Sequence, residues 1–322
     1  MTHKAPGKHY RKGISLIEIF QMFPDDATAE QWLIETRWPD GIHCPYCGSD
    51  RVQTGCRHKT MPFRCKEYKV CGRKFSAKSN SVMESSRLGY QIWAIAVYLL
   101  TTSLKSVSSM KLHRDLKVSQ KTAWHLAHRL RKSFEDGDQK FNGIVEADES
   151  YFGGLEKNRH ADKKLKSGRG AVGKKAVAGL KDRDTNRVAA KVIENTKRKT
   201  LHDFIGDNVE QGSTVCTDDF MSYQNMDGYD HRTVRHSVGE YVDENIHING
   251  MESFWSVLKR AHKGTFHKIS HKHLDRYVTE FAGRHNNRSL DTIRQMESIV
   301  RGMVGKRLKY RNLIGGIDGR LN

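Results

Sequence analysis

The sequence predicts an α/β protein in which one domain of mixed strands and helices follows smaller accessory modules. Its 322 residues are enough for one domain of ordinary size and one or two small modules. Four cysteines occur as two pairs within positions 44–71, between stretches of helical periodicity. Longer strand-like segments appear in the second half of the chain.

The first half divides into three segments. Apolar residues at helical spacing, such as Ile17 and Phe20, predict a helical N-terminal segment over 1–40. Composition then changes to Cys, Gly, Lys and Arg over 41–86, which predicts a small module held together by a metal ion. Helical periodicity returns over 87–137 and predicts a DNA-binding region of the helix-turn-helix type.

The second half alternates strands and helices. The expected strands are 143–147, 176–180, 188–193 and 213–217, with a helix at 200–209. This order predicts a ribonuclease-H-like core over 138–295, followed by a basic C-terminal tail over 296–322.

Charge points to a polyanionic partner. Lys and Arg number 56 against 37 Asp and Glu, a net charge of +19, while 37% hydrophobic residues suffice for a folded core. A basic protein associated with ribosomes is the alternative that composition leaves open. No segment is apolar enough for a membrane span and no hydrophobic stretch follows the basic N-terminus, so we expect a cytoplasmic, nucleoid-associated protein.

The cysteine pairs predict a structural zinc site. Cys44 and Cys47 are two residues apart and a glycine follows, an arrangement that turns both sulfurs toward one ion. Cys65 and Cys71 have a longer spacing, and His43 or His58 would substitute if Cys65 did not bind. Four such ligands make a closed tetrahedral site. Reduced cysteines buried as small apolar residues are the alternative.

A basic helix beginning at the capping residue Ser119 is the expected recognition helix, after a tight turn at Lys117. Its leading polar groups would reach base edges and its basic groups would meet phosphates. The predicted DNA-binding residues are Gln120, Lys121, His125, Arg129 and Lys132. An exposed charged helix of any domain has a similar pattern, and that interpretation stays open.

Acidic residues lie at two strand ends. Asp148 follows the strand 143–147, and Asp218 follows a later strand. Alternation places Glu146 and Asp148 on one face of the first strand and Glu149 on the other. Each such acid is also a common turn former, so the set matters more than any member.

A later helix carries Asn249, Glu252 and Lys259 on one face, because three residues turn about 300° and seven turn about 700°. The run from Asn249 to Glu252 also has the pattern of a capping box. Asp148, Asp218 and Glu252 are 70 and 34 residues apart, with Lys259 seven residues further on. This combination favours a shared site over separate local roles.

Three carboxylates suit phosphodiester chemistry. Cleavage needs an activated oxygen nucleophile and a stabilised leaving alkoxide, which two hard cations about 3.5 to 4 Å apart supply together. Oxygen ligands select Mg²⁺ or Mn²⁺. We therefore expect Asp148, Asp218 and Glu252 to hold two such ions, with Lys259 touching a DNA phosphate.

Several segments together resemble a known family. They are Cys44-x2-Cys47, Cys71-Gly-Arg-Lys-Phe-Ser, Asp148-Glu-Ser-Tyr-Phe-Gly-Gly, Asp218, and His247-Ile-Asn-Gly-Met-Glu-Ser-Phe-Trp255 with Lys259. Over about 16–287 the chain resembles bacterial insertion-sequence transposases with an N-terminal zinc ribbon, the ISXO2-like group related to the eukaryotic Merlin elements.

The resemblance implies a DDE-type transposase that nicks element ends and lets the freed 3′-hydroxyl attack target DNA, without a covalent protein intermediate. It implies Asp148, Asp218 and Glu252 as the three acids. Some members use Asn at the place of Asn249, and we favour Glu252 because a carboxylate binds metal better than an amide. The implied partners are double-stranded DNA, as terminal inverted repeats and target, and further copies of the chain in a synaptic complex.

Two other functions fit the same residues. A catalytically inactive or domesticated relative would bind DNA only as a regulator. A nuclease of the ribonuclease-H fold would hydrolyse branched DNA without strand transfer. Filled acidic positions argue against the first, and flanking inverted repeats in the genome would argue against the second.

Overall fold

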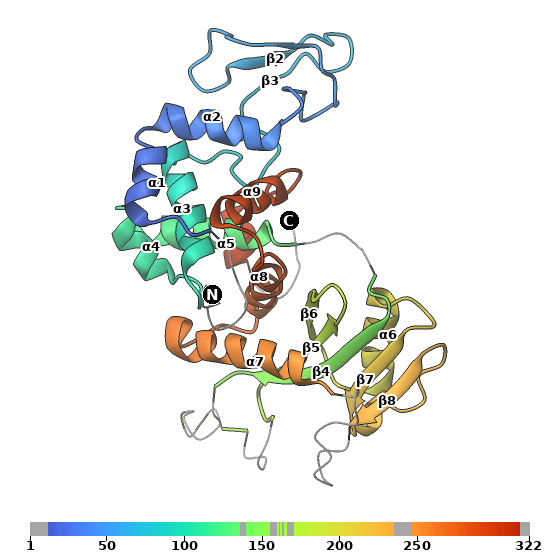
Figure 1. Ribbon diagram of the computed structural model, residues 1–322. Helices are drawn as coiled ribbons and strands as arrows, with labels where there is room; N and C mark the ends of the chain where they lie inside the picture. Colours follow the sequence, from blue (N-terminus) through green and yellow to red (C-terminus); the bar gives the residue numbers. More distant parts are fainter. Residues whose placement is uncertain are drawn as a thin grey trace, which may run out of the picture. The chain divides into compact units, whose positions relative to one another are not determined.

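The computed structural model describes residues 12–135, 140–154, 160, 162, 164–165, 171–234 and 247–315. The chain divides into two compact units, one of Met1–Glu135 with Asn287–Asn322 and the other of Asp136–Asn286. Figure 1 shows the elements of both units, coloured from the N-terminus to the C-terminus. None of the helices in the described ranges combines the length and apolar character that a membrane crossing requires.

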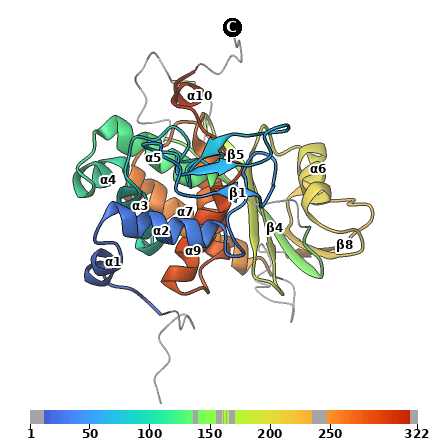
Figure 2. The same cartoon turned by 90° about the horizontal axis from the view of Figure 1, so that it is seen from above.

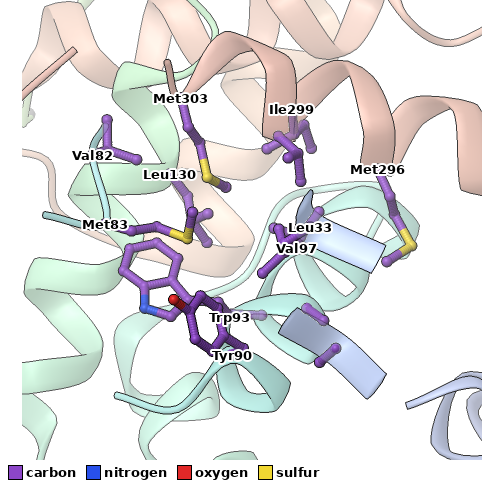
Figure 3. Packing of buried hydrophobic residues seen from close by; sticks show 14 of the residues in the cluster. Leu33, Val82, Met83, Tyr90, Trp93, Val97, Leu130, Met296, Ile299 and Met303 are labelled. Atoms are coloured by element: carbon purple, nitrogen blue, oxygen red, sulfur yellow. The ribbon is translucent and has the colours of Figure 1, made fainter. Parts of the chain in front are cut away.

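The first unit is built around α3 (Tyr90–Thr102), an apolar helix that is buried on most of its surface. α2 (Asp26–Arg37) and α9 (Thr292–Gly302) both pack against it. Figure 3 shows side chains of this core, among them Leu33, Trp93, Val97, Met296 and Ile299. Segments from both ends of the sequence therefore share one hydrophobic core.

A three-stranded antiparallel sheet follows α1 (Leu16–Met22) and α2 in the chain. Its strands are β1 (Val52–Gln53), β2 (Phe63–Cys65) and β3 (Lys74–Phe75). The rings of Phe63 and Phe75 both lie against Trp38, with centroids 6.1 and 6.0 Å away. This sheet thus belongs to the same core as the helices.

α4 (Ser109–Asp115) and α5 (Gln120–Lys132) form the expected helix-turn-helix pair. Lys117 adopts a left-handed backbone conformation with φ of 51°, which turns the chain sharply between them. The Ser119 side chain accepts a hydrogen bond from the Thr122 amide and so caps α5, as the sequence predicts.

The C-terminal region differs from the predicted boundary at residue 295. α9 begins at Thr292, and its residues Met296, Ile299 and Val300 are buried in the core of the first unit. A further helix, α10 (Tyr310–Ile314), belongs to the same unit. The apolar residues of this stretch have helical spacing, but the basic residues between them made the sequence look like a tail. Residues 316–322 lie outside the described ranges.

The second unit contains a five-stranded mixed sheet with strand order β6-β5-β4-β7-β8. β5 (Lys175–Asp182) pairs antiparallel with both β4 (Ile144–Phe152) and β6 (Val188–Ile193), whereas β7 (Thr214–Asp218) and β8 (Asp230–Val234) run parallel to β4. β4 is longer than the strand predicted for 143–147. Asp148 and Glu149 therefore lie inside a strand and not after it.

Helices cover both faces of this sheet. α6 (Arg198–Asn208) packs on the face that includes Val145 and Ala147, and α7 (Asn249–Ala261) with α8 (Leu274–Asn286) packs on the face that includes Val177. Figures 1 and 2 show α6 and α7 on opposite sides of the strands. This arrangement brings the start and middle of α7 against β4.

The edge strand β6 is protected by α8. Asp275 accepts a hydrogen bond from the Val192 amide, and the Asn286 side chain bonds both the amide and the carbonyl of Val188. These contacts satisfy backbone groups that an exposed edge would leave open to pairing with another chain.

Candidate functional sites

The four predicted cysteines form one cluster in the first unit. The sulfur atoms of Cys44, Cys47, Cys65 and Cys71 all lie within 4.8 Å of one another. The Sγ atoms of Cys44 and Cys71 are 3.7 Å apart and those of Cys47 and Cys65 are 3.6 Å apart. A zinc–sulfur bond of about 2.3 Å in tetrahedral geometry gives a separation of about 3.8 Å. The cluster therefore fits a structural zinc ion.

His43 and His58, the alternative ligands considered from the sequence, are not needed in this site because all four cysteines are in the cluster. Nδ1 of His58 accepts hydrogen bonds from the amides of Thr60 and Met61, and Nδ1 of His43 lies 3.4 Å from the Gly41 carbonyl oxygen. Cys65 occupies the fourth position because β2 ends at this residue and its strand register brings it back to the first cysteine pair.

Asp148 and Asp218 are placed side by side by the sheet. β4 and β7 pair in parallel with Ile144 opposite Thr214 and Glu146 opposite Cys216. Continuing this register by two residues sets Asp148 opposite Asp218, because both strands advance one residue at a time in the same direction. The 70-residue interval in the sequence thus becomes adjacency across one strand pair.

Both oxygens of Asp148 are held by hydrogen bonds. The backbone amide of Glu149 donates to Oδ1 at 2.8 Å, and the indole Nε1 of Trp255 donates to Oδ2 at 3.0 Å. Trp255 lies on α7 and is 3% exposed. The carboxylate is therefore fixed from two directions, with its remaining lone pairs free for another ligand.

Glu149 is a further acid at this place that the sequence analysis did not assign. The buried hydroxyl of Tyr223 donates to its Oε2 at 2.7 Å. As alternation predicts, Glu149 and Asp148 leave β4 on opposite faces, toward Tyr223 and Trp255. Both nevertheless line one cleft. Only the three-dimensional contact with Tyr223 identifies this residue.

The acids repel one another. Burial, together with the charges of Glu149 and Asp218, raises the pKa of Asp148 to about 7. Burial and the charge of Asp218 also raise the pKa of Glu149, against the opposing hydrogen bond from Tyr223. Among the described residues neither Asp148 nor Glu149 has an ion-pair partner. A divalent cation would relieve this repulsion, so the donor set fits Mg²⁺ or Mn²⁺.

α7 supplies the other side of the cleft, whose volume is about 450 Å³. Glu252 and Lys259 line it together with Asp148. Asn249 is exposed and Asp218 is half-buried, and neither contributes to the lining. The structure thus brings Asp148, Glu252 and Lys259 to one cleft and Asp218 to the strand beside it. Within the described ranges, the four cysteines are the group whose ligand atoms lie close enough together to hold one metal ion.

The capping-box interpretation of residues 249–252 is wrong. α7 begins at Asn249 with Ile248 at the N-cap position, and no side chain of this run caps it. Instead Oε2 of Glu146, on β4, accepts the Met251 amide at 3.0 Å. Glu252 is left exposed beside the cleft and is available as a ligand.

Glu146 anchors the start of α7 to the sheet. It is 1% exposed, and Nε of Arg183 donates to its Oε1 at 2.9 Å. A negative charge at the N-terminus of a helix is favourable because unpaired amides point toward it. A Cβ on Gly250 would lie 2.7 Å from Glu146 Oε2, so glycine permits this close approach. The position of Glu252 therefore depends on a buried acid on β4.

Basic residues face the acids across the same cleft. Lys259, Arg260 and Lys263 line it, the last from the π-helical turn His262–Phe266 that continues α7. A cleft lined by both acidic and basic side chains suits a substrate that carries phosphates and brings them to a metal.

Two predicted DNA-binding residues of α5 contact the C-terminal segment. Nε2 of His125 lies 3.1 Å from the Leu308 carbonyl oxygen, and Arg129 donates to that oxygen at 3.4 Å and to the Glu84 carbonyl at 3.1 Å. The Lys121 ammonium lies over the ring of Tyr310, 4.6 Å from its centroid. Part of this helix face is thus covered by residues 308–310.

The remaining two residues of that set have local partners. Gln120 donates to the Ser109 hydroxyl of α4 at 3.3 Å, and Lys132 pairs with Glu135 at 2.7 Å. Both contacts are with neighbouring parts of the chain. The role of these five residues in DNA binding stays a prediction.

Comparison with known proteins defines the class. Family models match for an ISXO2-like transposase domain over residues 140–286 and for a transposase zinc-ribbon domain over residues 24–74. An uncharacterized protein in the transposable element ISH50 of Halobacterium salinarum is 30% identical over 280 residues, which are 80% of this chain and 90% of that protein. An uncharacterized transposase-like protein of Haemophilus influenzae is 31% identical over 121 residues, 37% of this chain and 97% of that protein.

These matches define a transposase with a zinc ribbon. The chain belongs to the ISXO2-like transposase family. The resemblance predicted from the sequence is confirmed, and so is the zinc ribbon around the four cysteines.

Proposed function

We propose that this protein catalyses metal-dependent cleavage and strand transfer of an insertion sequence after binding the terminal inverted repeats of the element. The observation that carries the proposal is that Asp148 and Glu252, from separate segments, line one cleft, with Asp218 on the strand beside it. Asp148 and Asp218 share a register on neighbouring strands, and Glu252 of α7 lines the cleft with Asp148. Lys259 lies in the same cleft to contact DNA phosphate.

The sheet supports a ribonuclease-H-like core. β4, β5 and β6 form an antiparallel meander, β7 and β8 continue the sheet in parallel with β4, and helices cover both faces. In such a core the acids gather at the central strand and its parallel neighbour. Asp148 on β4 and Asp218 on β7 occupy those two strands.

Asp148, Asp218 and Glu252 would hold Mg²⁺ or Mn²⁺, with Glu149 beside them. When bound, a pair of such ions activates water or a 3′-hydroxyl and stabilises the leaving oxygen. The residues of the chain orient the metal ligand and position the DNA. Trp255 and the Glu149 amide orient Asp148, and the basic residues of α7 position the phosphate backbone.

DNA is the proposed partner of the first unit as well. The net charge of +19 favours a polyanion, and the zinc ribbon and the helix-turn-helix pair are modules that commonly bind nucleic acid. Bringing two element ends together requires more than one copy of the chain, so we propose a homo-oligomer acting on chromosomal DNA in the nucleoid.

Labelled DNA that carries the element ends tests the proposal. Purified full-length protein with Mg²⁺ should yield cleaved and joined products, and Asp148→Asn should abolish both while a gel shift of the ends persists. Asp203→Asn, an exposed acid of α6, is the matched control and should cut normally. Binding without cutting under varied metals and salts would favour the regulator, and cutting without joining would favour the nuclease.

A further inference from the structure

One side chain of α7 links the core of the second unit to the acid at its centre. The Trp255 indole is buried among Phe152, Phe254 and Leu258, yet its single polar atom leaves that core and donates to Asp148 at 3.0 Å. Trp255 also lines the cleft beside Glu252. A buried indole N–H needs a hydrogen-bond acceptor, and here the acceptor is the acid that lines the cleft.

The opposite strand is shaped to receive this ring. Gly179 on β5 lies directly across from Asp148 in the β4–β5 register. A Cβ at Gly179 would lie 2.7 and 2.9 Å from Cζ2 and Cη2 of Trp255, and 2.3 Å from Cε of Met251. Contacts this short are not tolerated between a Cβ and a rigid ring, so the missing side chain is what lets the indole lie close to the strand at this position.

We propose that Gly179 and Trp255 act as a positioning pair that fixes the carboxylate of Asp148 for divalent-metal binding. Gly179 provides the space, Trp255 fills it and donates the hydrogen bond, and Asp148 keeps one orientation in which its free lone pairs face the cleft. The inference rests on the proposed function, because it assigns to Asp148 the metal expected there. Partners of metal ligands commonly change metal affinity by about 10- to 100-fold when removed.

Metal binding provides the test, since it needs no DNA and no turnover. Mn²⁺ is titrated into the zinc-loaded full-length protein, with affinity measured by calorimetry and by tryptophan fluorescence. Trp255 is the only tryptophan between residues 136 and 286, so a signal that disappears in Trp255→Phe reports on this site. The proposal predicts that Trp255→Phe, which keeps a ring but loses the donor, weakens Mn²⁺ binding about tenfold.

Gly179→Ala should weaken Mn²⁺ binding by a similar factor, because it displaces the indole. In the Trp255→Phe background the same change should have a much smaller effect on Mn²⁺ binding, because the two indole atoms it strikes are gone and the hydrogen bond is already lost, while the remaining contact is with the flexible end of Met251. Phe281→Leu is the control for a loosened hydrophobic core. Phe281 is a buried residue of α8 in the same hydrophobic cluster as Trp255. Its variant should bind Mn²⁺ like wild type.

Three results are informative. Weakened binding in both single variants, with non-additivity in the double variant, supports the pair. Unchanged affinity in Trp255→Phe and Gly179→Ala, while Asp148→Asn abolishes binding, overturns the inference and leaves the proposed function intact. Wild-type protein that binds Mn²⁺ no better than Asp148→Asn overturns both. Thermal unfolding of each variant identifies any that fail to fold, and if Trp255→Phe is one of them, Gly179→Ala carries the test.

Discussion

Asp148 and Asp218 lie at matching positions on neighbouring parallel strands, and this relationship organises the second unit. The register of β4 and β7, continued two residues past Glu146 and Cys216, sets them side by side, and the charge of Asp218 contributes to the raised pKa of both Asp148 and Glu149. Such an arrangement is unfavourable without a cation and favourable with one. Glu146, two residues before Asp148, differs from these acids because its charge is paired with Arg183.

The stability of the zinc-loaded protein, with no divalent cation at the acids, should fall as pH rises from about 4 to about 7. Asp148 has a folded-state pKa near 7 against the usual 3.8, so within this window the folded state holds a proton that the unfolded state releases. The stabilising contribution of the protonated form is therefore lost as pH rises. Asp148→Asn, which stays neutral, should flatten this part of the profile. Urea unfolding at several pH values, in buffer free of Mg²⁺ and Mn²⁺, measures this dependence of the unfolding free energy on pH. A wild-type profile identical to that of the variant would contradict the assignment.

Loss of the zinc ion should unfold the ribbon and weaken the core it shares with the helices. Cys65→Ser removes one of four ligands, and we expect about one equivalent of zinc to be lost together with a large drop in the unfolding temperature. Cys56→Ser is the matched control, because Cys56 lies outside the cluster. A colorimetric zinc assay and thermal unfolding measure both effects. Full zinc content in Cys65→Ser would point to a histidine as the fourth ligand.

Removing Arg183 should cost more than removing a surface cation. Arg183→Met leaves the buried Glu146 without its arginine, with only the ring of His247 close to Oε1 at 3.2 Å, and losses of this kind are about 3–5 kcal/mol in the free energy of unfolding. Lys199→Met breaks an exposed pair with Asp203 and should cost less than about 1 kcal/mol. Because Glu146 also holds the first turn of α7, Arg183→Met should in addition lower DNA cleavage. Equal destabilisation by the two variants in urea unfolding would show that Glu146 is solvated.

Arg129 and Gln120 should separate stability from DNA binding on α5. Arg129→Ala removes contacts with the Leu308 and Glu84 carbonyls and should destabilise the first unit by about 1–3 kcal/mol. Gln120→Ala, near the exposed start of the helix, should cost less than about 0.5 kcal/mol. If the predicted face binds DNA, both weaken binding of the element ends in a gel shift. A Gln120→Ala variant with normal affinity would remove this residue from the DNA-binding face.

Local patterns in the sequence were sufficient for the elements that carry the acids. Apolar runs identified β4 and β7, and helical spacing identified α7, because burial imposes those periods directly on the residues. The pairing of these two strands was not predicted, because the expected first strand stopped before Asp148, whereas β4 continues to Phe152. The strand β8 was missed because most of its side chains are exposed and show no clear alternation between buried and exposed positions.

Long-range contacts were beyond the sequence. Nothing in the residues around Tyr223 indicates that its hydroxyl will meet Glu149, 74 positions earlier, and the same holds for Trp255 and Asp148. The run from Asn249 to Glu252 suited a capping box locally, yet Glu146 on β4 took that role. Tertiary contacts decide between such local alternatives, and they also turned the expected C-terminal tail into α9.

Mn²⁺ binding across a panel of acid variants tests most directly whether Asp148, Asp218 and Glu252 share cations. At a pH well above the pKa of Asp148, calorimetry on the full-length protein should show that Asp148→Asn, Asp218→Asn and Glu252→Gln each weaken binding at least about tenfold, whereas Asn249→Ala binds like wild type. Wild-type affinity in Glu252→Gln, or loss of binding in Asn249→Ala alone, would contradict the account.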